Sequence, residues 1–227
     1  MGTKIVKKKL GLSYKKTKLI PGNTQPVEVQ EAFIEEYEKL KEAAENGENH
    51  LLFFDPTHQV HNTVNGNCWQ TKGKKGTVIL SSNTGRKRIS VLGAIDSITG
   101  DCTVITTENN CDKDMVILTF NEIRKKYSDG KDIVIILDNA SYNHAYKTVE
   151  EAALLGIRLI FLPTYSPNLN LIERLWKFLK KIVLKNKYYK TFNEFRNAIE
   201  SFFVNIQIHK KNIMKLLNHK FEIIIAE

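Results

Sequence analysis

Residues 159–190 read L-I-F-L-P-T-Y-S-P-N-L-N-L-I-E-R-L-W-K-F-L-K-K-I-V-L-K-N-K-Y-Y-K. The apolar run 157–162 predicts a short strand, and the prolines, serine and asparagines of 163–170 predict a turn after it. Beyond the turn, apolar residues recur on one stripe at intervals of three and four: Ile172, Leu175, Trp176, Leu179, Ile182 and Val183. We therefore expect a strand that leads through a turn into an amphipathic helix.

The charges of this stretch are unevenly distributed. Glu173 is its only acid and lies in the first turn of the predicted helix. The positive residues that follow meet no further acid: Arg174, Lys177, Lys180, Lys181, Lys185, Lys187 and Lys190. A single carboxylate in front of a basic face suits a metal-dependent site that acts on a polyanion.

The chain as a whole has 227 residues, enough for one well-packed domain and a small appendage. Its formal net charge of +9 favours a polyanionic partner through counterion release, although basic proteins without such a partner exist. The three cysteines have no close paired spacing, so we expect no disulfide framework and a reducing, cytoplasmic or nucleoid setting. No apolar run approaches the roughly 18 residues that span a bilayer, so we expect no membrane partner.

The first 26 residues differ from the rest in composition. Seven lysines precede the first acid, Glu28, and two prolines with Gly22 and Asn23 close the segment as a linker. One interpretation is a solvated basic tail. The other is the end of a DNA-binding module whose earlier helices are missing, which divides the chain into residues 1–26 and a main domain over 27–227.

Periodicity and turn residues predict the remaining elements. We expect helices over 29–45, 112–127 and 145–155 and one or two more over 191–217, strands over 50–54, 89–95, 102–106 and 133–137, and a hairpin or protruding loop over 69–88. The run 133–137 is apolar throughout, which is typical of a central strand covered on both faces. This order of elements predicts an α/β protein with a mixed sheet and helices on both faces, because strands come first, then alternating helices and strands, and then helices.

Two of the predicted strands end on an aspartate. Asp55 follows one strand, Asp138 follows another, and Glu173 starts a helix after the next strand. Because the carboxyl ends of neighbouring strands converge on one crevice, we expect the three carboxylates to meet. Three oxygen ligands without a Cys/His set suit Mg²⁺ or Mn²⁺, not zinc. Two such ions, roughly 3.5–4 Å apart, would activate a water or 3′-hydroxyl and stabilise the leaving oxygen of a phosphodiester.

Each of these acids also has a structural alternative. An aspartate after a strand is usually a turn former. The run Asn170-Leu-Ile-Glu173 resembles a capping box, in which Glu173 only caps its helix. His58 and His61 stand near Asp55, but two histidines without a third ligand are weak evidence for zinc. We expect a surface position first, and otherwise a contact that supports the carboxylates or binds DNA. The joint placement of the three carboxylates in a basic surround favours a site.

Three sequence blocks surround these acids: L-L-F-F-D-P-T-H at Asp55, I-V-I-I-L-D-N-A-S-Y at Asp138 and L-P-T-Y-S-P-N-L-N-L-I-E-R-L-W-K-F-L-K at Glu173. The motifs G-R-K-R-I-S-V-L-G-A-I-D and Y-Y-K-T-F-N-E-F accompany them, and 34 residues separate Asp138 from Glu173. In these features the chain resembles the catalytic part of DDE transposases, in the bacterial insertion-sequence branch of the mariner-like superfamily. The resemblance covers residues 10–205.

This resemblance implies a ribonuclease-H-like fold with a mixed five-stranded sheet. It implies Asp55, Asp138 and Glu173 as the catalytic triad that binds two Mg²⁺ or Mn²⁺ ions. Such transposases are endonucleases that cut double-stranded DNA at transposon ends, the terminal inverted repeats. They then join the freed 3′ ends to target DNA, and they work as homodimers.

Further residues are expected around this triad. His58, Asn170 and Trp176 are expected to support the carboxylates. The residues expected to contact DNA lie in the loop, after Asp138 and on the basic helix: Lys72, Lys74, Lys75, Arg86, Arg88, Asn139, His144, Arg174, Lys177, Lys180 and Lys181.

The sequence departs from the family in three places. Leu171 replaces the usual proline of the third block, and Asn143, followed by His144, stands where a histidine is common. Members of this family carry two helix-turn-helix units before the catalytic domain. We expect residues 4–21 to keep at most a remnant of these units and a linker, as in a truncated, frameshifted or trimmed chain. The alternatives to an active transposase are therefore an idle DNA-binding or dimerising remnant and another ribonuclease-H-like nuclease.

Overall fold

A computed structural model describes residues 22–72, 76–218 and 220–225. The basic segment up to residue 21 lies outside the described residues, as do Lys74 and Lys75 of the set expected to contact DNA. The division of the chain after residue 26 therefore stays a prediction. In the described part, no helix has the length and apolar character needed to cross a lipid bilayer.

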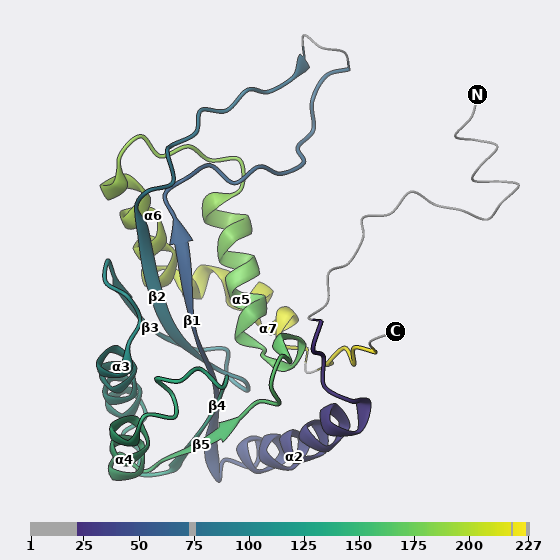
Figure 1. Ribbon diagram of the computed structural model, residues 1–227, viewed down its shortest axis with the longest axis vertical. Coiled ribbons are helices and arrows are strands. Elements are labelled where there is room, and N and C mark those ends of the chain that lie inside the picture. Colours follow the sequence, from purple (N-terminus) through teal and green to yellow (C-terminus); the bar gives the residue numbers. More distant parts are fainter. Residues whose placement is uncertain (1–21, 73–75, 219, 226–227) are drawn as a thin grey trace, which may run out of the picture.

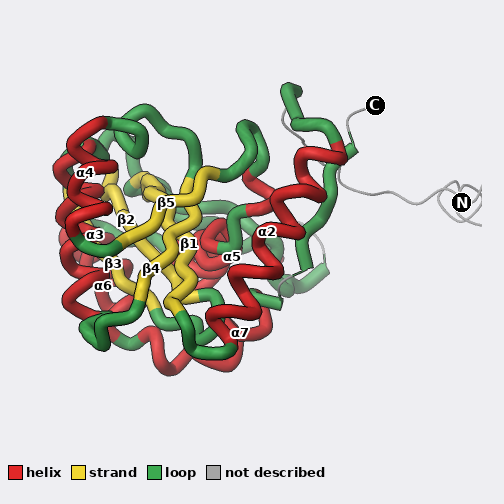
Figure 2. The backbone as a smooth tube through the Cα atoms, turned by 90° about the horizontal axis from the view of Figure 1, so that it is seen from below, coloured by secondary structure: helices red, strands yellow, loops and turns green. Residues whose placement is uncertain are grey.

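Five strands form one mixed sheet in the order β3-β2-β1-β4-β5 (Figures 1 and 2). The strands are β1 Asn49–Val60, β2 Arg88–Asp96, β3 Cys102–Thr107, β4 Asp132–Leu137 and β5 Ile157–Phe161. β2 is antiparallel to β1 and β3, whereas β4 is parallel to β1 and β5. The predicted mixed five-stranded sheet is confirmed.

β1 is longer than the sequence pattern predicts, because it has two partners. Residues 49–53 pair with β4, and residues 52–60 pair with β2. Asp55 therefore lies within the strand, and the prediction that it ends a strand was wrong. The continuous apolar run does stop at Phe54, but backbone pairing with β2 continues beyond it, and a pattern of side chains does not reveal such pairing.

Helices cover both faces of the sheet, as predicted (Figure 2). The α-helices of the described residues are α2 Val27–Glu45, α3 Lys113–Lys126, α4 Tyr146–Leu154, α5 Ile172–Leu179, α6 Phe192–Val204 and α7 Lys210–Leu216. Side chains alternate along β1, so that Leu51 and Phe53 join the core under α2, α5, α6 and α7. Leu52 and Phe54 join the core under α3 and α4. β4 is likewise buried on both faces, which explains its uninterrupted apolar run.

The helix of the third sequence block is shorter than its apolar stripe. α5 ends at Leu179, and a π-helical turn, Lys180–Leu184, continues it. A 3₁₀ turn, Pro167–Leu169, precedes α5, and another, Ile206–His209, precedes α7. The predicted turn, helix and basic extension are therefore present, with the helical hydrogen bonding changed at both ends.

The segment between β1 and β2 is a protruding loop, with no hairpin among its described residues (Figure 1). Its base is closed by a hydrogen bond from His61 N to Lys87 O. An isolated bridge then joins Val64 to Lys185, at the end of the π-helical turn. The loop is thus attached at its base both to the sheet and to the segment that follows α5.

The face of the sheet under α5 is shaped by one glycine. Gly93 of β2 pairs with Asp55, and an added Cβ at Gly93 would lie 2.6 Å from Cη2 of Trp176. Trp176 is only 1% exposed, so its ring has little room to move. The absence of a side chain at Gly93 therefore admits the indole ring against the sheet.

We predict that Gly93→Ala lowers the free energy of unfolding by about 1–3 kcal/mol, because overpacking forces the indole out of its position. Urea denaturation would measure the change. Gly22→Ala is the matched control, since no atom of the described residues lies within 4 Å of the Cβ that it adds. A Gly93→Ala protein as stable as the control would contradict this account of the packing.

Candidate active site

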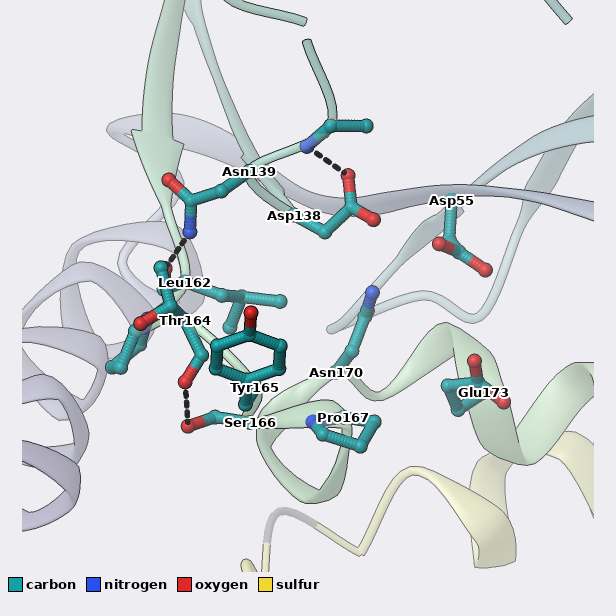
Figure 3. A pocket seen from close by; sticks show the side chains of 12 residues that line it. Asp55, Asp138, Asn139, Leu162, Thr164, Tyr165, Ser166, Pro167, Asn170 and Glu173 are labelled. Carbon is teal, nitrogen blue, oxygen red and sulfur yellow. Dashed lines mark hydrogen bonds between the residues drawn. The ribbon is translucent and has the colours of Figure 1, made fainter. Parts of the chain in front are cut away.

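The structure brings Asp55, Asp138 and Glu173 to one pocket of about 400 Å³ (Figure 3). Asp55 comes from β1, Asp138 follows β4, and Glu173 lies in the first turn of α5. The remaining wall is formed by residues on the segments after β4 and β5: Asn139, Ala140, Leu162, Pro163, Thr164, Tyr165, Ser166, Pro167 and Asn170. The three acids that sequence analysis singled out therefore share one cavity.

The parallel register explains why the two aspartates are neighbours. Phe53 of β1 pairs with Ile136 of β4, and each aspartate stands two residues further along the chain from its paired residue. Side chains two residues apart point to the same face, so the two carboxylates emerge side by side. The capping alternative for Glu173 was wrong, because the N-cap of α5 is Leu171 and no side chain caps the helix.

The pocket concentrates negative charge. Its lining, as far as the chain is described, includes three carboxylates and no lysine or arginine. Burial, together with the charges of Glu173 and Asp138, raises the pKa of Asp55 to about 8. The indole Nε1 of Trp176 opposes this shift by donating a hydrogen bond to Asp55 Oδ2 at 3.0 Å. Among the residues that the structure describes, no positively charged side chain lines the pocket to offset this repulsion.

Asp138 is held by a residue that sequence analysis did not assign to the site. Nδ2 of Asn143 donates to Asp138 Oδ1 at 2.8 Å, and Ala140 N donates to the same oxygen at 3.1 Å. Asn143 is fully buried. Its position five residues after Asp138 was noted only as a departure from the family, and the spacing alone did not reveal that the amide fixes the carboxylate.

The donor set fits a hard divalent cation. Carboxylate oxygens are the ligands that Mg²⁺ and Mn²⁺ prefer, and the charge of a cation would offset the repulsion that raises the pKa of Asp55. In the described residues, no three His, Cys, Asp or Glu side chains lie close enough together to hold a metal ion as they stand. Like charges favour separation, so the three side chains would have to turn inward around a cation.

Tyr165 marks the mouth of the pocket. Its φ is 56°, a left-handed conformation that is uncommon for a bulky residue, and 59% of its surface is exposed. Tyr165 lies in a turn between Pro163 and Pro167. An exposed aromatic ring therefore stands at the rim of an acidic cavity, at the cost of local backbone strain.

The residues expected to support the carboxylates separate into two groups. Trp176 contacts Asp55, and Asn170 lines the pocket. His58 does not lie there, because it is three residues beyond Asp55 and side chains alternate along the strand. Its Nδ1 lies 3.0 Å from Ser90 Oγ instead.

Among the residues expected to contact DNA, Asn139 lies at the pocket and His144 contacts it. Asn139 lines the pocket, and its Oδ1 lies 3.1 Å from His144 Nε2. The His144 ring stacks on Phe161, with 4.0 Å between the ring centroids. Both residues are exposed and held in place.

The cations expected to contact DNA are spread more widely. Lys177, Lys180 and Lys181 are exposed beyond the pocket, on α5 and the π-helical turn. The guanidinium of Arg174 is less free to contact DNA, because it donates hydrogen bonds to the carbonyls of Leu216 and Lys220.

The loop cations lie away from the carboxylates. Lys72 and Arg86 are exposed in the loop. Arg88 is exposed at the start of β2, five residues or about 17 Å along the strand from the partner of Asp55. The structure therefore does not gather the predicted DNA contacts around the carboxylates.

A family model of the DDE superfamily endonucleases matches residues 50–196 of the chain. The chain is 26% identical over 141 residues to the insertion element IS630 uncharacterized 39 kDa protein of Shigella sonnei, a match that covers 60% of this chain and 40% of that protein. It is 32% identical over 84 residues to the uncharacterized protein y4pE/y4sA of Sinorhizobium fredii (strain NBRC 101917 / NGR234), covering 37% of this chain and 60% of that protein. The matches span less than two thirds of either relative.

Solved structures share the fold. The crystal structure of the Mos1 mariner paired end complex with Mn superposes with a TM-score of 0.70 at 13% identity, covering 94% of this chain and 66% of that chain. The catalytic domain of Mos1 mariner transposase superposes with a TM-score of 0.57 at 11% identity, covering 91% of this chain and 94% of that chain. At such identities the likeness shows the fold alone, and it confirms the ribonuclease-H-like architecture.

The raised pKa of Asp55 predicts how the stability of the metal-free protein depends on pH. The carboxyl loses its proton near pH 3.8 in the unfolded chain and near pH 8 in the folded chain. Between these values the folded state binds more protons, so the free energy of unfolding falls as pH rises through this window. With a chelator present, we expect the melting temperature to fall from about pH 5 to about pH 8, and Asp55→Asn to remove that part of the decrease.

Asp132→Asn is the control for this experiment, because Asp132 is exposed at the start of β4. It should keep the pH dependence of the wild type. An unchanged dependence in Asp55→Asn would show that Asp55 ionises normally in the folded protein.

Proposed function

The chain belongs to the DDE superfamily endonucleases, and on this premise we propose that it is the catalytic domain of a transposase that cuts and joins DNA. The proposed reaction is metal-dependent strand cleavage at transposon ends, followed by transfer of the freed 3′ ends into target DNA. The observation that carries the proposal is one pocket lined by Asp55, Asp138 and Glu173 and, among the described residues, by no lysine or arginine.

In the proposed mechanism the three carboxylates would hold two Mg²⁺ or Mn²⁺ ions. Bound divalent ions would lower the pKa of a water or 3′-hydroxyl and stabilise the charge on the scissile phosphate. The protein's own part is to supply and orient the oxygens. Trp176 fixes one oxygen of Asp55, while Asn143 and the N–H of Ala140 fix one oxygen of Asp138. This leaves the other oxygen of each aspartate for a ligand.

Double-stranded DNA is the proposed substrate and partner. One solved structure with the same fold is the Mos1 transposase paired-end complex with a left transposon end, on which this chain superposes with a TM-score of 0.67. The net charge of +9 and the exposed Lys177, Lys180 and Lys181 suit a phosphate backbone. A homodimer that holds two DNA ends, and a DNA-binding segment in residues 1–26, are parts of the same proposal.

The first test is the relaxation of supercoiled plasmid. We expect nicking that requires Mg²⁺ or Mn²⁺ and that falls at least about 10- to 100-fold in Asp138→Asn, because a metal ligand is lost. Asp132→Asn, exposed at the start of the strand that Asp138 follows, should cut at the wild-type rate. Equal nicking by all three proteins would place the activity elsewhere, and intact DNA binding without nicking would favour an idle remnant.

The basic surface beyond the pocket gives a separate prediction. If Lys177, Lys180 and Lys181 contact phosphates, replacing all three by alanine should weaken DNA binding and reduce the salt slope of binding by about one unit per contact. Binding isotherms at several salt concentrations would measure this. The matched control replaces Lys113, Lys125 and Lys147, which are exposed on α3 and α4 over the opposite face of the sheet. Equal salt slopes in the two triple variants would show that Lys177, Lys180 and Lys181 contact solvent and not phosphates.

A further inference from the structure

Asn170 is a buried polar side chain that lines the carboxylate pocket. It is 4% exposed and stands between the 3₁₀ turn Pro167–Leu169 and α5. Its backbone N–H donates to Pro167 O, and its carbonyl accepts from Glu173 N, each at 3.2 Å. The residue is therefore fixed in the same turn that carries Glu173.

The amide oxygen of Asn170 has no partner among the described residues. Oδ1 is buried and accepts no hydrogen bond, while the amide nitrogen points into the pocket toward the space beside Asp138 and Asp55 (Figure 3). Helix capping does not account for the side chain, because Leu171 occupies the N-cap of α5. A buried acceptor without a donor is unfavourable unless a different arrangement satisfies it.

The two ends of an amide exchange by rotation about the last side-chain bond, and the surrounding charges decide which end faces inward. The nitrogen end suits a pocket that holds carboxylates alone, because N–H groups are attracted to their oxygens. A cation in the pocket reverses this preference and attracts the oxygen end. Asparagine oxygens are ordinary ligands of hard divalent ions.

Building on the metal site of the proposed function, we propose that Asn170 is a further ligand of the divalent cation and turns its Oδ1 toward it. A neutral oxygen adds a ligand without adding a fourth negative charge to the pocket. The same rotation removes the orphaned oxygen from the interior. Asn170 thereby differs from Asn143, whose amide nitrogen is already committed to Asp138.

The test measures Mn²⁺ binding to the full chain by calorimetry, without DNA. Asn170→Leu keeps a similar volume and removes both amide ends. We expect its dissociation constant for Mn²⁺ to rise about tenfold or more. Its melting temperature in chelator should be at or above that of the wild type, because an unpartnered buried oxygen is gone. Asn170→Asp, which keeps an oxygen, should retain Mn²⁺ binding.

Asn168→Leu is the matched control from the same turn. Nδ2 of Asn168 donates to Gln30 Oε1 at 3.1 Å and to Glu222 O at 2.7 Å, and the residue does not line the pocket. It should lose thermal stability and keep the Mn²⁺ affinity of the wild type. The two variants thus separate a ligand from a structural residue.

Wild-type Mn²⁺ affinity in Asn170→Leu would overturn the proposal. So would lost plasmid nicking at unchanged affinity, since the amide would then act on DNA. Asp138→Asn, measured in parallel, separates this failure from that of the proposed function. If Asp138→Asn weakens Mn²⁺ binding and Asn170→Leu does not, only the role of Asn170 fails, whereas a wild-type chain that binds no Mn²⁺ overturns both.

Discussion

The parallel register between β1 and β4 is the constraint on which the candidate site depends. It places Asp55 and Asp138 side by side, each two residues beyond the paired Phe53 and Ile136. A shift of one residue would send one carboxylate to the opposite face, under α3 and α4. The apolar side chains of both strands, buried on both faces, hold this register, so the same packing that stabilises the sheet also aligns the acids.

Helix α5 depends on that alignment and reinforces it. Its first turn brings Glu173 to the pocket, and one turn later Trp176 inserts over Gly93 and donates to Asp55. α5 and the paired strands β1 and β2 therefore meet at the carboxylate of Asp55. The arrangement opposes stability locally, since it holds like charges together in a partly buried pocket, and the apolar core under α5 offsets that cost.

Much of this organisation could be predicted from the sequence, and the misses have physical causes. The run 133–137 indicated a buried strand because it is apolar on both faces, and the third block indicated its helix by spacing. The end of β1 was misplaced because hydrogen bonding to β2 continues where the apolar run stops. His58 was expected near the site because it is close to Asp55 in sequence. It is three residues away on β1, so the alternation of side chains points it to the opposite face of the sheet. Asn143 lies only five residues after Asp138, but spacing does not reveal which way its amide points in the loop. The carbonyl partners of Arg174 are more than 40 residues away, in contacts that no local pattern records.

The loop between β1 and β2 has one more consequence. The two ends of the loop are joined at its base by hydrogen bonds from His61 N to Lys87 O and from Thr63 Oγ1 to Ser81 O. Gly66 N also donates a hydrogen bond to Asn186 Oδ1, beyond α5. Closing a longer or shorter tip over such a base costs little, because loop-closure entropy varies only slowly with length. The tip is therefore free to diverge in length and composition during evolution, and the carboxylates need not be rebuilt when it does.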